Sequence, residues 1–240
     1  DNGFYTKAEI LLQLSLEIRE EVFKPNHEQI AFSLNNLALN YAHQGFYSKA
    51  VPLLERAIQI NEKVLGADHL QTATNVNNLA SMYDEQGFYK KAEPLYLRAL
   101  QIREKVLGPE DPAVANSLYN LGLQYADRSL YSKAKSFLLR ALTIREKVLG
   151  PEHPITAISL NGLSSLYSTQ GLYNKAEPLL LRSLALSEKT LGAEHPTTAN
   201  ALSNLALHYA NQGLYSKAEP LYLRALKIEE KALGQNHPDT

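Results

Sequence analysis

The chain has 240 residues, of which 24 are basic and 25 acidic, and it contains no cysteine. A net charge of -1 without a basic run excludes the electrostatic footprint of a nucleic-acid or anionic-membrane binder, and the missing cysteines exclude a disulfide framework. Because no stretch approaches the length of a membrane span and the N-terminus does not resemble a signal peptide, we expect a cytoplasmic protein without nucleic acid or membrane as partner.

A period of 42 residues runs through the whole chain without insertion or deletion. Tyrosine recurs once per period, and lysine and alanine follow it two and three residues later. The recurring tyrosines are Tyr5, Tyr47, Tyr89, Tyr131, Tyr173 and Tyr215. A fixed period of this length indicates an array of repeats in which each repeat covers the apolar face of its neighbour.

Two kinds of helix alternate along the predicted array, beginning with a second helix at about 6–23. First helices are expected at about 29–43, 71–85, 113–127, 155–169 and 197–211. Second helices are expected to follow them at about 48–65, 90–107, 132–149, 174–191 and 216–233, which gives a total of eleven helices. The array forms one domain over 1–240, with a partial unit 1–27 and units of about 28–69, 70–111, 112–153, 154–195 and 196–237. Because the chain starts inside a unit and lacks an initial Met, we expect it to be a fragment of a longer protein.

Each first helix carries large apolar residues at i, i+3 and i+7, as at Leu34, Leu37 and Tyr41, with a small residue between them. This spacing places the apolar residues on one helical face and lets the partner helix approach closely. A glycine such as Gly45 follows and predicts a left-handed helix end. In the third complete unit Ser129 replaces this glycine, so we expect Ser129 to adopt the left-handed conformation.

The start of each second helix shows a capping-box pattern, in which Ser, Asn or Thr precedes Glu by three residues. The pairs are Ser216 with Glu219, Asn174 with Glu177, and Thr6 with Glu9. A proline follows in the expected first turn, where most backbone N–H groups lack helical acceptors; these are Pro52, Pro94, Pro178 and Pro220. Two apolar stripes then indicate a helix packed between two neighbours.

One His or Asp precedes each first helix, at His27, His69, Asp111, His153, His195 and His237. Because these residues recur once per unit, we interpret them as helix caps rather than as metal ligands, which would have to converge at about 2 Å from one ion. No phosphate-binding loop, dinucleotide fingerprint, nucleophile elbow or H-E-x-x-H stretch occurs. We therefore predict no catalytic residue, no metal and no cofactor.

The residues of one helix pair resemble the tetratricopeptide repeat; they are Leu34, Leu37, Ala38, Tyr41, Gly45, Tyr47, Ala50, Leu54 and Ala57. The 42-residue form, with N-N-L-A and R-A-L-x-I-x-E-K stretches, is similar to the repeats of kinesin light chains and to bacterial, notably cyanobacterial, arrays. The resemblance implies an all-α fold, a right-handed superhelix of helix–turn–helix repeats. A HEAT or armadillo array has a similar period, but the Gly-x-Tyr-x-x-Ala spacing argues against it.

The resemblance also implies a concave, peptide-binding groove lined by the first helices. Within one chain, residues that recur in every unit are interpreted as packing residues, whereas those that vary along the first helices are candidates for recognising a partner. The expected groove residues are Asn35, Asn77, Asp84, Asn116, Tyr119, Asp127, Asn161, Asn200 and Ser203. Kinesin light chains often carry Lys two residues before the first Leu of this helix, where it helps to receive acidic peptides. This chain has no cation at that position, and Asp84, Glu85 and Asp127 predict a mildly acidic groove.

A second set of asparagines lies one residue further along the first helices, at Asn36, Asn78, Asn120 and Asn204. We expect them to form a ladder of buried amides between stacked helices, because an unsatisfied buried amide would cost about 1–3 kcal/mol. Contact with a ligand is the alternative for these residues.

The sequence thus predicts a non-catalytic scaffold that binds a peptide or protein segment in its groove. The alternative is an architectural or self-associating module that regulates an attached signalling effector domain, and an enzyme is a distant third. The alternative of self-association depends on the two ends of the array. Terminal helices of such arrays usually have a polar outer face, but both terminal helices of this chain keep an apolar stripe. We expect Leu11, Leu14 and Ile18 to be exposed at one end, and Leu221, Ile228 and Leu233 at the other.

Overall fold

The computed structural model describes residues 2–233, which contain eleven helices, and the chain divides into two compact units. Unit 1 comprises Asp1–Pro109 and unit 2 comprises Glu110–Thr240. Within residues 2–233 every helix is too short or too polar to cross a lipid bilayer. The all-α class and the eleven expected helices are confirmed.

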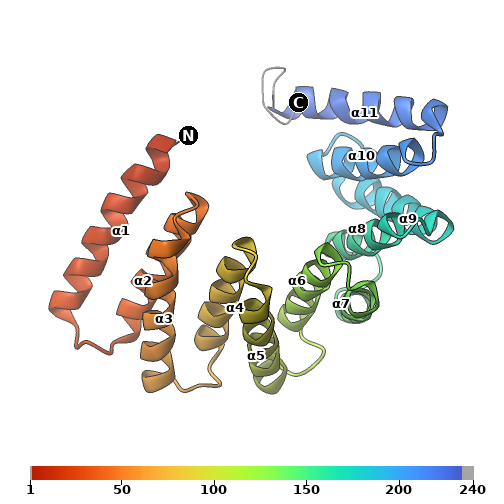
Figure 1. Cartoon of the computed structure of the whole chain (residues 1–240). Helices are drawn as coiled ribbons and strands as arrows, with labels where there is room; N and C mark the ends of the chain where they lie inside the picture. Colours follow the sequence, from red (N-terminus) through yellow and green to blue (C-terminus); the bar gives the residue numbers. More distant parts are fainter. Residues whose placement is uncertain (1, 234–240) are drawn as a thin grey trace. The chain divides into compact units, whose positions relative to one another are not determined.

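Unit 1 contains α1 to α5, which follow one another side by side, from red to olive in Figure 1. Their bounds are α1 Asn2–Val22, α2 Glu28–His43, α3 Tyr47–Val64, α4 Leu70–Glu85 and α5 Tyr89–Leu107. Unit 2 contains α6 Pro112–Asp127, α7 Tyr131–Val148, α8 Pro154–Thr169, α9 Tyr173–Leu191, α10 Pro196–Ala210 and α11 Tyr215–Leu233. The first helices of the repeats are α2, α4, α6, α8 and α10, and the others are second helices.

Each helix packs against the next along the chain within its unit, and the first helices also contact one another. These extra contacts join α2 to α4 in unit 1, and α6 to α8 and α8 to α10 in unit 2. Among the described residues, the backbones of second helices in one unit do not approach each other this closely. The first helices therefore line the more tightly packed side of each unit, which we call the first-helix surface.

The apolar face predicted for each first helix forms the core of both units. Leu34, Leu118, Leu160 and Leu202 are fully buried at equivalent positions. Close helix approach depends on the small residue of the repeat. At Gly122 an added Cβ would lie 2.6 Å from Cγ of Leu138, a side chain of α7.

The expected caps of the first helices are confirmed within the described residues. In each case the backbone N–H two residues later donates to the side chain: 3.2 Å at His27, 3.1 Å at His69, 2.8 Å at Asp111, 3.2 Å at His153 and 3.1 Å at His195. His237 lies outside the described residues. Each capping histidine accepts this hydrogen bond through Nδ1, so Nδ1 carries no proton in the capped state.

The capping box predicted for the second helices is wrong, because these helices begin one or more residues earlier. α3 begins at Tyr47 after an N-cap residue, Phe46, whose side chain makes no capping bond. Phe46 N–H donates to Tyr41 O at 2.8 Å and Gly45 N–H to Ala42 O at 2.9 Å, which is a Schellman motif. Phe46 is therefore both part of the C-terminal motif of α2 and the N-cap residue of α3. No other residue between the two helices can serve as a side-chain cap.

That geometry also corrects the proline prediction. Pro52 and its equivalents Pro94, Pro178 and Pro220 lie inside their helices, beyond the first turn. The left-handed conformation expected of Ser129 is confirmed, with φ of 57°, close to the 77° of Gly45 in another repeat. Leu130 N–H completes the same motif by donating to Tyr125 O at 2.8 Å.

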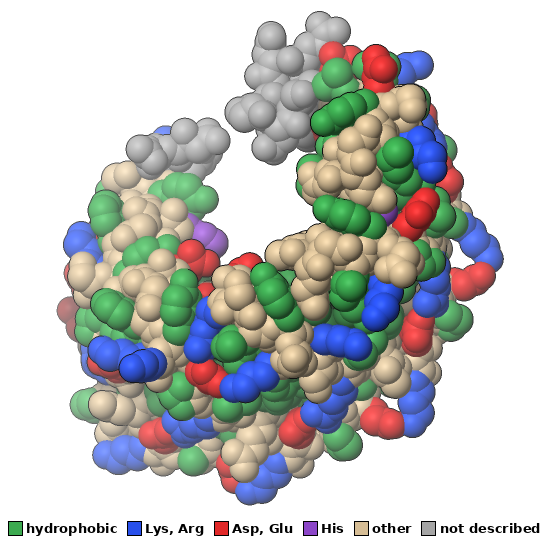
Figure 2. All heavy atoms as spheres, turned by 45° about the vertical axis from the view of Figure 1, so that its right-hand side comes forward, with side chains coloured by type: hydrophobic (Ala, Val, Ile, Leu, Met, Phe, Trp, Pro, Cys, Tyr) green, Lys and Arg blue, Asp and Glu red, His purple; other side chains and the backbone are tan. Residues whose placement is uncertain are grey.

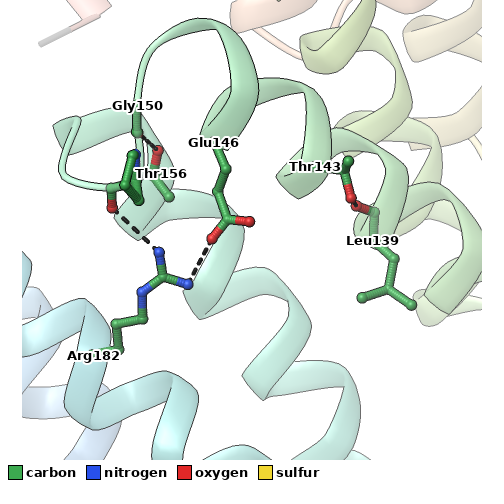
Figure 3. A network of polar contacts seen from close by, with 7 residues as sticks. Leu139, Thr143, Glu146, Gly150, Thr156 and Arg182 are labelled. Atoms are coloured by element: carbon green, nitrogen blue, oxygen red, sulfur yellow. Dashed lines mark hydrogen bonds and ion pairs between the residues drawn. The ribbon is translucent and has the colours of Figure 1, made fainter.

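Second helices are joined across their outer side by ion pairs that repeat along the chain. Arg56 pairs with Glu20 at 2.5 Å in unit 1, and Arg182 with Glu146 at 2.6 Å in unit 2. Figure 3 shows Arg182 between Glu146 and the loop that starts at Gly150, where it also donates to Pro151 O at 3.3 Å. These side chains are partly exposed to solvent, so each pair adds at most about 1 kcal/mol.

The prediction for the ends is half right. Leu11, Leu14 and Ile18 on α1 are exposed, by 67%, 50% and 50%. On α11, however, Ile228 is only 2% exposed and Leu221 is half-buried, because both pack against α10. The large apolar residues exposed on α11 are instead Tyr215, Tyr222, Leu223 and Leu226. The side chain of Leu233 lies outside the described part.

Candidate functional site: the first-helix surface

The predicted groove residues lie on the first helices, and two hollows on this surface collect only some of them. In unit 1, a hollow of about 430 Å³ is lined by Asn35 but not by Asn77 or Asp84. In unit 2, a hollow of about 390 Å³ is lined by Tyr119 and Asn161. The other predicted residues of unit 2 lie outside it; they are Asn116, Asp127, Asn200 and Ser203.

Asparagines of neighbouring first helices are linked on this surface in unit 1. Asn78 Nδ2 donates to Asn35 Oδ1 at 2.8 Å, and Asn35 Nδ2 donates to Asn36 Oδ1 at 3.4 Å. All three side chains are half-buried, so they remain within reach of a ligand.

The predicted ladder of buried amides is wrong. Asn36 and Asn78 are half-buried, and Asn120 and Asn204 are exposed. These positions face the first-helix surface, where solvent can satisfy the amides, rather than the interior between helices. Asn204 in fact lines the unit 2 hollow, which favours the alternative interpretation of ligand contact for that residue.

The second helices contribute arginines to this surface, and sequence reasoning missed them. Arg145 of α7 is 4% exposed, donates to Ser159 Oγ at 2.5 Å and to Asn116 Oδ1 at 2.7 Å, and lies 4.9 Å from the ring centre of Tyr119. Burial lowers the pKa of Arg145 and raises that of Tyr119. The sequence did contain a sign that this position is a candidate for recognition. Its residue type varies between units, being Arg, Asn, Ser or Glu.

Arg19 and Arg103 occupy the same repeat position in unit 1. Arg19 donates to Ser33 Oγ at 2.5 Å and lies 5.6 Å from the ring centre of Phe32, while Arg103 donates to Asn77 Oδ1 at 3.3 Å. The prediction of a mildly acidic groove considered only residues of the first helices. The arginines from the second helices offset that negative charge. Figure 2 shows basic and acidic side chains interspersed over the face in view.

Two residues beside the unit 2 hollow, one on each of two neighbouring first helices, differ from the residues usual at their repeat positions. Tyr119 of α6 stands where other first helices have Asn or Ser, and Gly162 of α8 stands where they have Asn. A Cβ at Gly162 would lie 2.6 Å from Cε2 of Tyr119, so the ring occupies the space that a larger residue would need. In unit 1 the corresponding pair is the hydrogen-bonded Asn35 and Asn78.

His208 of α10 lines the same hollow and was not predicted. It is 2% exposed, its Nδ1 lies 3.4 Å from Ser168 Oγ, and its Nε2 lies 2.9 Å from Gln212 Nε2. Because an amide nitrogen can only donate, Nε2 accepts and Nδ1 carries the proton toward Ser168. Burial lowers the pKa of His208, an effect that Glu177 partly offsets, so the ring is neutral at pH 7. Other units hold Asn, Met, Gln or Leu here.

These residues provide hydrogen-bonding and apolar contacts on the first-helix surface of each unit. Amides and hydroxyls can donate to and accept from a peptide backbone. Large apolar side chains are exposed beside them, namely Phe32 by 50%, Ile158 by 45% and Leu207 by 51%. Such a mixture suits binding of another chain.

Among solved structures, BtubC (BKLC) from P. vanneervenii is 23% identical, with a TM-score of 0.81 over 98% of this chain and 94% of that one. A candidate kinesin light chain from Podospora anserina with nearly identical TPR-like repeats is 28% identical, with a TM-score of 0.73 over 88% and 99%. The apo form of RapI is 18% identical, with a TM-score of 0.68 over 95% and 92%. The first and third of these likenesses concern the fold alone.

No curated protein matches the sequence. The family model described as "Tetratricopeptide repeat" matches residues 1–63, 30–93, 73–147, 114–189 and 167–231. Arrays of this family serve generically as protein-interaction modules, and the fold is typically non-catalytic. With matches over nearly its whole length and helix pairs of the expected kind, the chain belongs to the tetratricopeptide repeat family.

Proposed function

We propose that the chain is a non-catalytic scaffold that binds an extended peptide or protein segment along its first-helix surface. The observation that carries this proposal is where the repeats differ from one another. Recurring residues such as Leu34 and Gly45 form the core and the turns, whereas most residues at the two hollows change from unit to unit.

Recognition would combine amide hydrogen bonds with apolar contacts. Asn35, Asn77 and Asn161 occupy equivalent positions and can exchange a donor and an acceptor with a peptide backbone. Tyr119 offers a rigid aromatic surface, of a kind enriched among residues that dominate binding energy. The remaining predicted contacts, namely Asp84 in unit 1 and Asn116, Asp127, Asn200 and Ser203 in unit 2, would border a segment bound to their own unit.

A peptide-display screen against the whole chain tests the proposal. The variant Asn77→Ala/Tyr119→Ala/Asn161→Ala should weaken a selected peptide by over about tenfold, because it removes hydrogen bonds and an aromatic contact. Its thermal midpoint should stay close to that of the parent.

The matched control is Gln101→Ala/Thr143→Ala/Asn174→Ala, which alters exposed residues of second helices. It should leave the affinity unchanged. Equal affinity of the parent and the first-helix variant would show that this surface is not the binding site.

The second candidate is an architectural or self-associating module that acts on an attached effector domain. The exposed apolar face of α1 favours it, since Leu11, Leu14 and Ile18 present a stripe that is 50–67% exposed. Contiguous exposed apolar patches mark interaction sites.

A further inference from the structure

The unit 2 hollow gathers four residues at which its repeats depart from the others. Tyr119, Gly162, Ser168 and His208 each replace a different residue found at the same position elsewhere in the array, and all four line this one space. Since recurring residues are explained by packing, a cluster of departures around one hollow points to recognition. At about 390 Å³ the hollow falls within the size range of ligand sites.

The lining of the hollow is uncharged. It consists of amide and hydroxyl side chains together with Tyr119, leucines and the neutral His208. The unit 1 hollow differs, because Glu28 contributes a carboxylate to its lining. A charged ligand group in the unit 2 hollow would lose its hydration without gaining an opposite charge from these walls, which is unfavourable.

One polar atom of this lining is left without a partner. Asn161 Oδ1 is buried and accepts no hydrogen bond from any described residue. A buried acceptor in this state costs about 1–3 kcal/mol. Because Asn161 lines the hollow, rotation of its side chain toward a ligand that donates an N–H or O–H group would remove this cost.

Ser168, which also lines the hollow, offers a hydrogen-bond donor, whereas Asn161 Oδ1 offers an acceptor. Its Oγ accepts from the protonated Nδ1 of His208, so its own hydroxyl proton can be donated to a ligand. Asn161 and Ser168 are seven residues apart on α8, which places them on one face and about 10 Å apart along the helix axis. That distance corresponds to about three residues of extended chain.

Building on the proposed function, we infer that the unit 2 hollow binds an uncharged, extended peptide segment of about three residues, which donates a hydrogen bond to Asn161, accepts one from Ser168 and places an apolar side chain beside Leu123 and Leu207. Leu207 is 51% exposed and Leu123 half-buried, so both have apolar surface to offer. Tyr119, held over Gly162, forms one wall of the site.

Three pools of capped heptapeptides of equal length provide the test on the whole chain. The neutral pool contains Asn, Gln, Ser and Leu; the acidic pool has Asp and Glu in place of Asn and Gln; the basic pool has Lys and Arg there. Fluorescence anisotropy should give at least about tenfold tighter binding for the best neutral peptides, as expected from the cost of burying an unpaired charge.

Two variants of the hollow, Asn161→Leu and Ser168→Ala, should each weaken the best neutral peptide by about fivefold or more, since each removes one hydrogen bond. Asn174→Leu is the control, at an exposed asparagine of the second helix α9, and should leave that affinity unchanged. Thermal unfolding of each variant confirms that it is folded.

Equal or tighter binding of the acidic or basic pool, failure of the neutral pool to bind, or a neutral peptide indifferent to both hollow variants overturns the inference. If an acidic peptide binds and loses affinity in the Asn77/Tyr119/Asn161 variant, the first-helix surface remains the binding site and only the uncharged specificity is wrong. The two failures are thereby distinguished.

Discussion

Ser129 is the one non-glycine residue with a positive φ among residues 2–233. Its φ of 57° is a conformation that glycine adopts without steric cost, so Ser129→Gly should raise the free energy of unfolding by about 0.4–1 kcal/mol. Urea denaturation measures this change. The control Ser136→Gly, within α7, should instead lower the free energy of unfolding by about 0.5 kcal/mol, and a destabilised Ser129→Gly variant would contradict the argument.

His208 makes the stability of unit 2 sensitive to pH. Because burial lowers its pKa in the folded state, the unfolded chain binds the proton first as the pH falls below about 6.5. The contribution of neutral His208 is therefore fully present above about pH 6.5 and is lost as the pH falls toward the lowered, folded-state pKa.

The variant His208→Asn should flatten this dependence without unfolding the chain, because Asn40 at the same repeat position already pairs with Gln44 at 2.7 Å. Denaturation curves between pH 8 and 5 compare it with the parent. A slope unchanged by His208→Asn would show that this ring titrates normally.

At the scale of helices, the approach of α6 to α7 depends on the missing side chain of Gly122. Adding Cβ there would place it 2.6 Å from Leu138 Cγ, so Gly122→Ala should destabilise by about 1–3 kcal/mol despite its better helix propensity. Chemical denaturation gives the value. In a Leu138→Ala background the loss should be smaller, because the clashing atoms are gone, whereas additive losses would refute the clash.

The sequence predicted the helices and first-helix caps well, because their signals are local and repeated. Leu34 with Leu37 and Tyr41 defines a buried face, and His69 can satisfy the N–H of Gln71 without distant residues. The start of the second helices was mispredicted because Phe46 serves two helices through backbone bonds, which no side-chain pattern reveals.

The candidate site was less predictable, because it depends on which side chains cross between helices. Arg145 reaches Asn116 and Tyr119 from a second helix, whereas the predicted residues were drawn from first helices only. The ring of Tyr119 can lie against α8 only because residue 162, 43 residues later in the chain, is a glycine. Ile228 was assigned to the wrong face because its apolar stripe serves α10 rather than a following helix.

For the whole molecule, exposed apolar residues on α1 and α11 predict self-association that increases with protein concentration. Light scattering over a concentration series should show a rising mean mass, because burial of apolar surface on α1 favours assembly. The variant Leu11→Glu/Leu14→Lys should abolish the rise while keeping the net charge.

A comparison with Leu223→Lys on α11 separates two modes of assembly. Head-to-tail contact requires both helices, so either variant would abolish it, whereas an α1–α1 contact would persist in Leu223→Lys. A parent that stays monomeric at high concentration contradicts the prediction, and with it the self-associating alternative.

The double role of Phe46 limits how the coding sequence of this array can change in length. Since the same residue ends α2 and begins α3, one inserted codon would turn the second helix by about 100° about its axis and expose its buried stripe. If insertions at this turn are not tolerated, the repeats keep a constant length, as the uninterrupted 42-residue period shows. Insertion scanning should find tolerated sites at exposed Ala67 and Asp68, in the other connection of the repeat, and none between Gln44 and Tyr47.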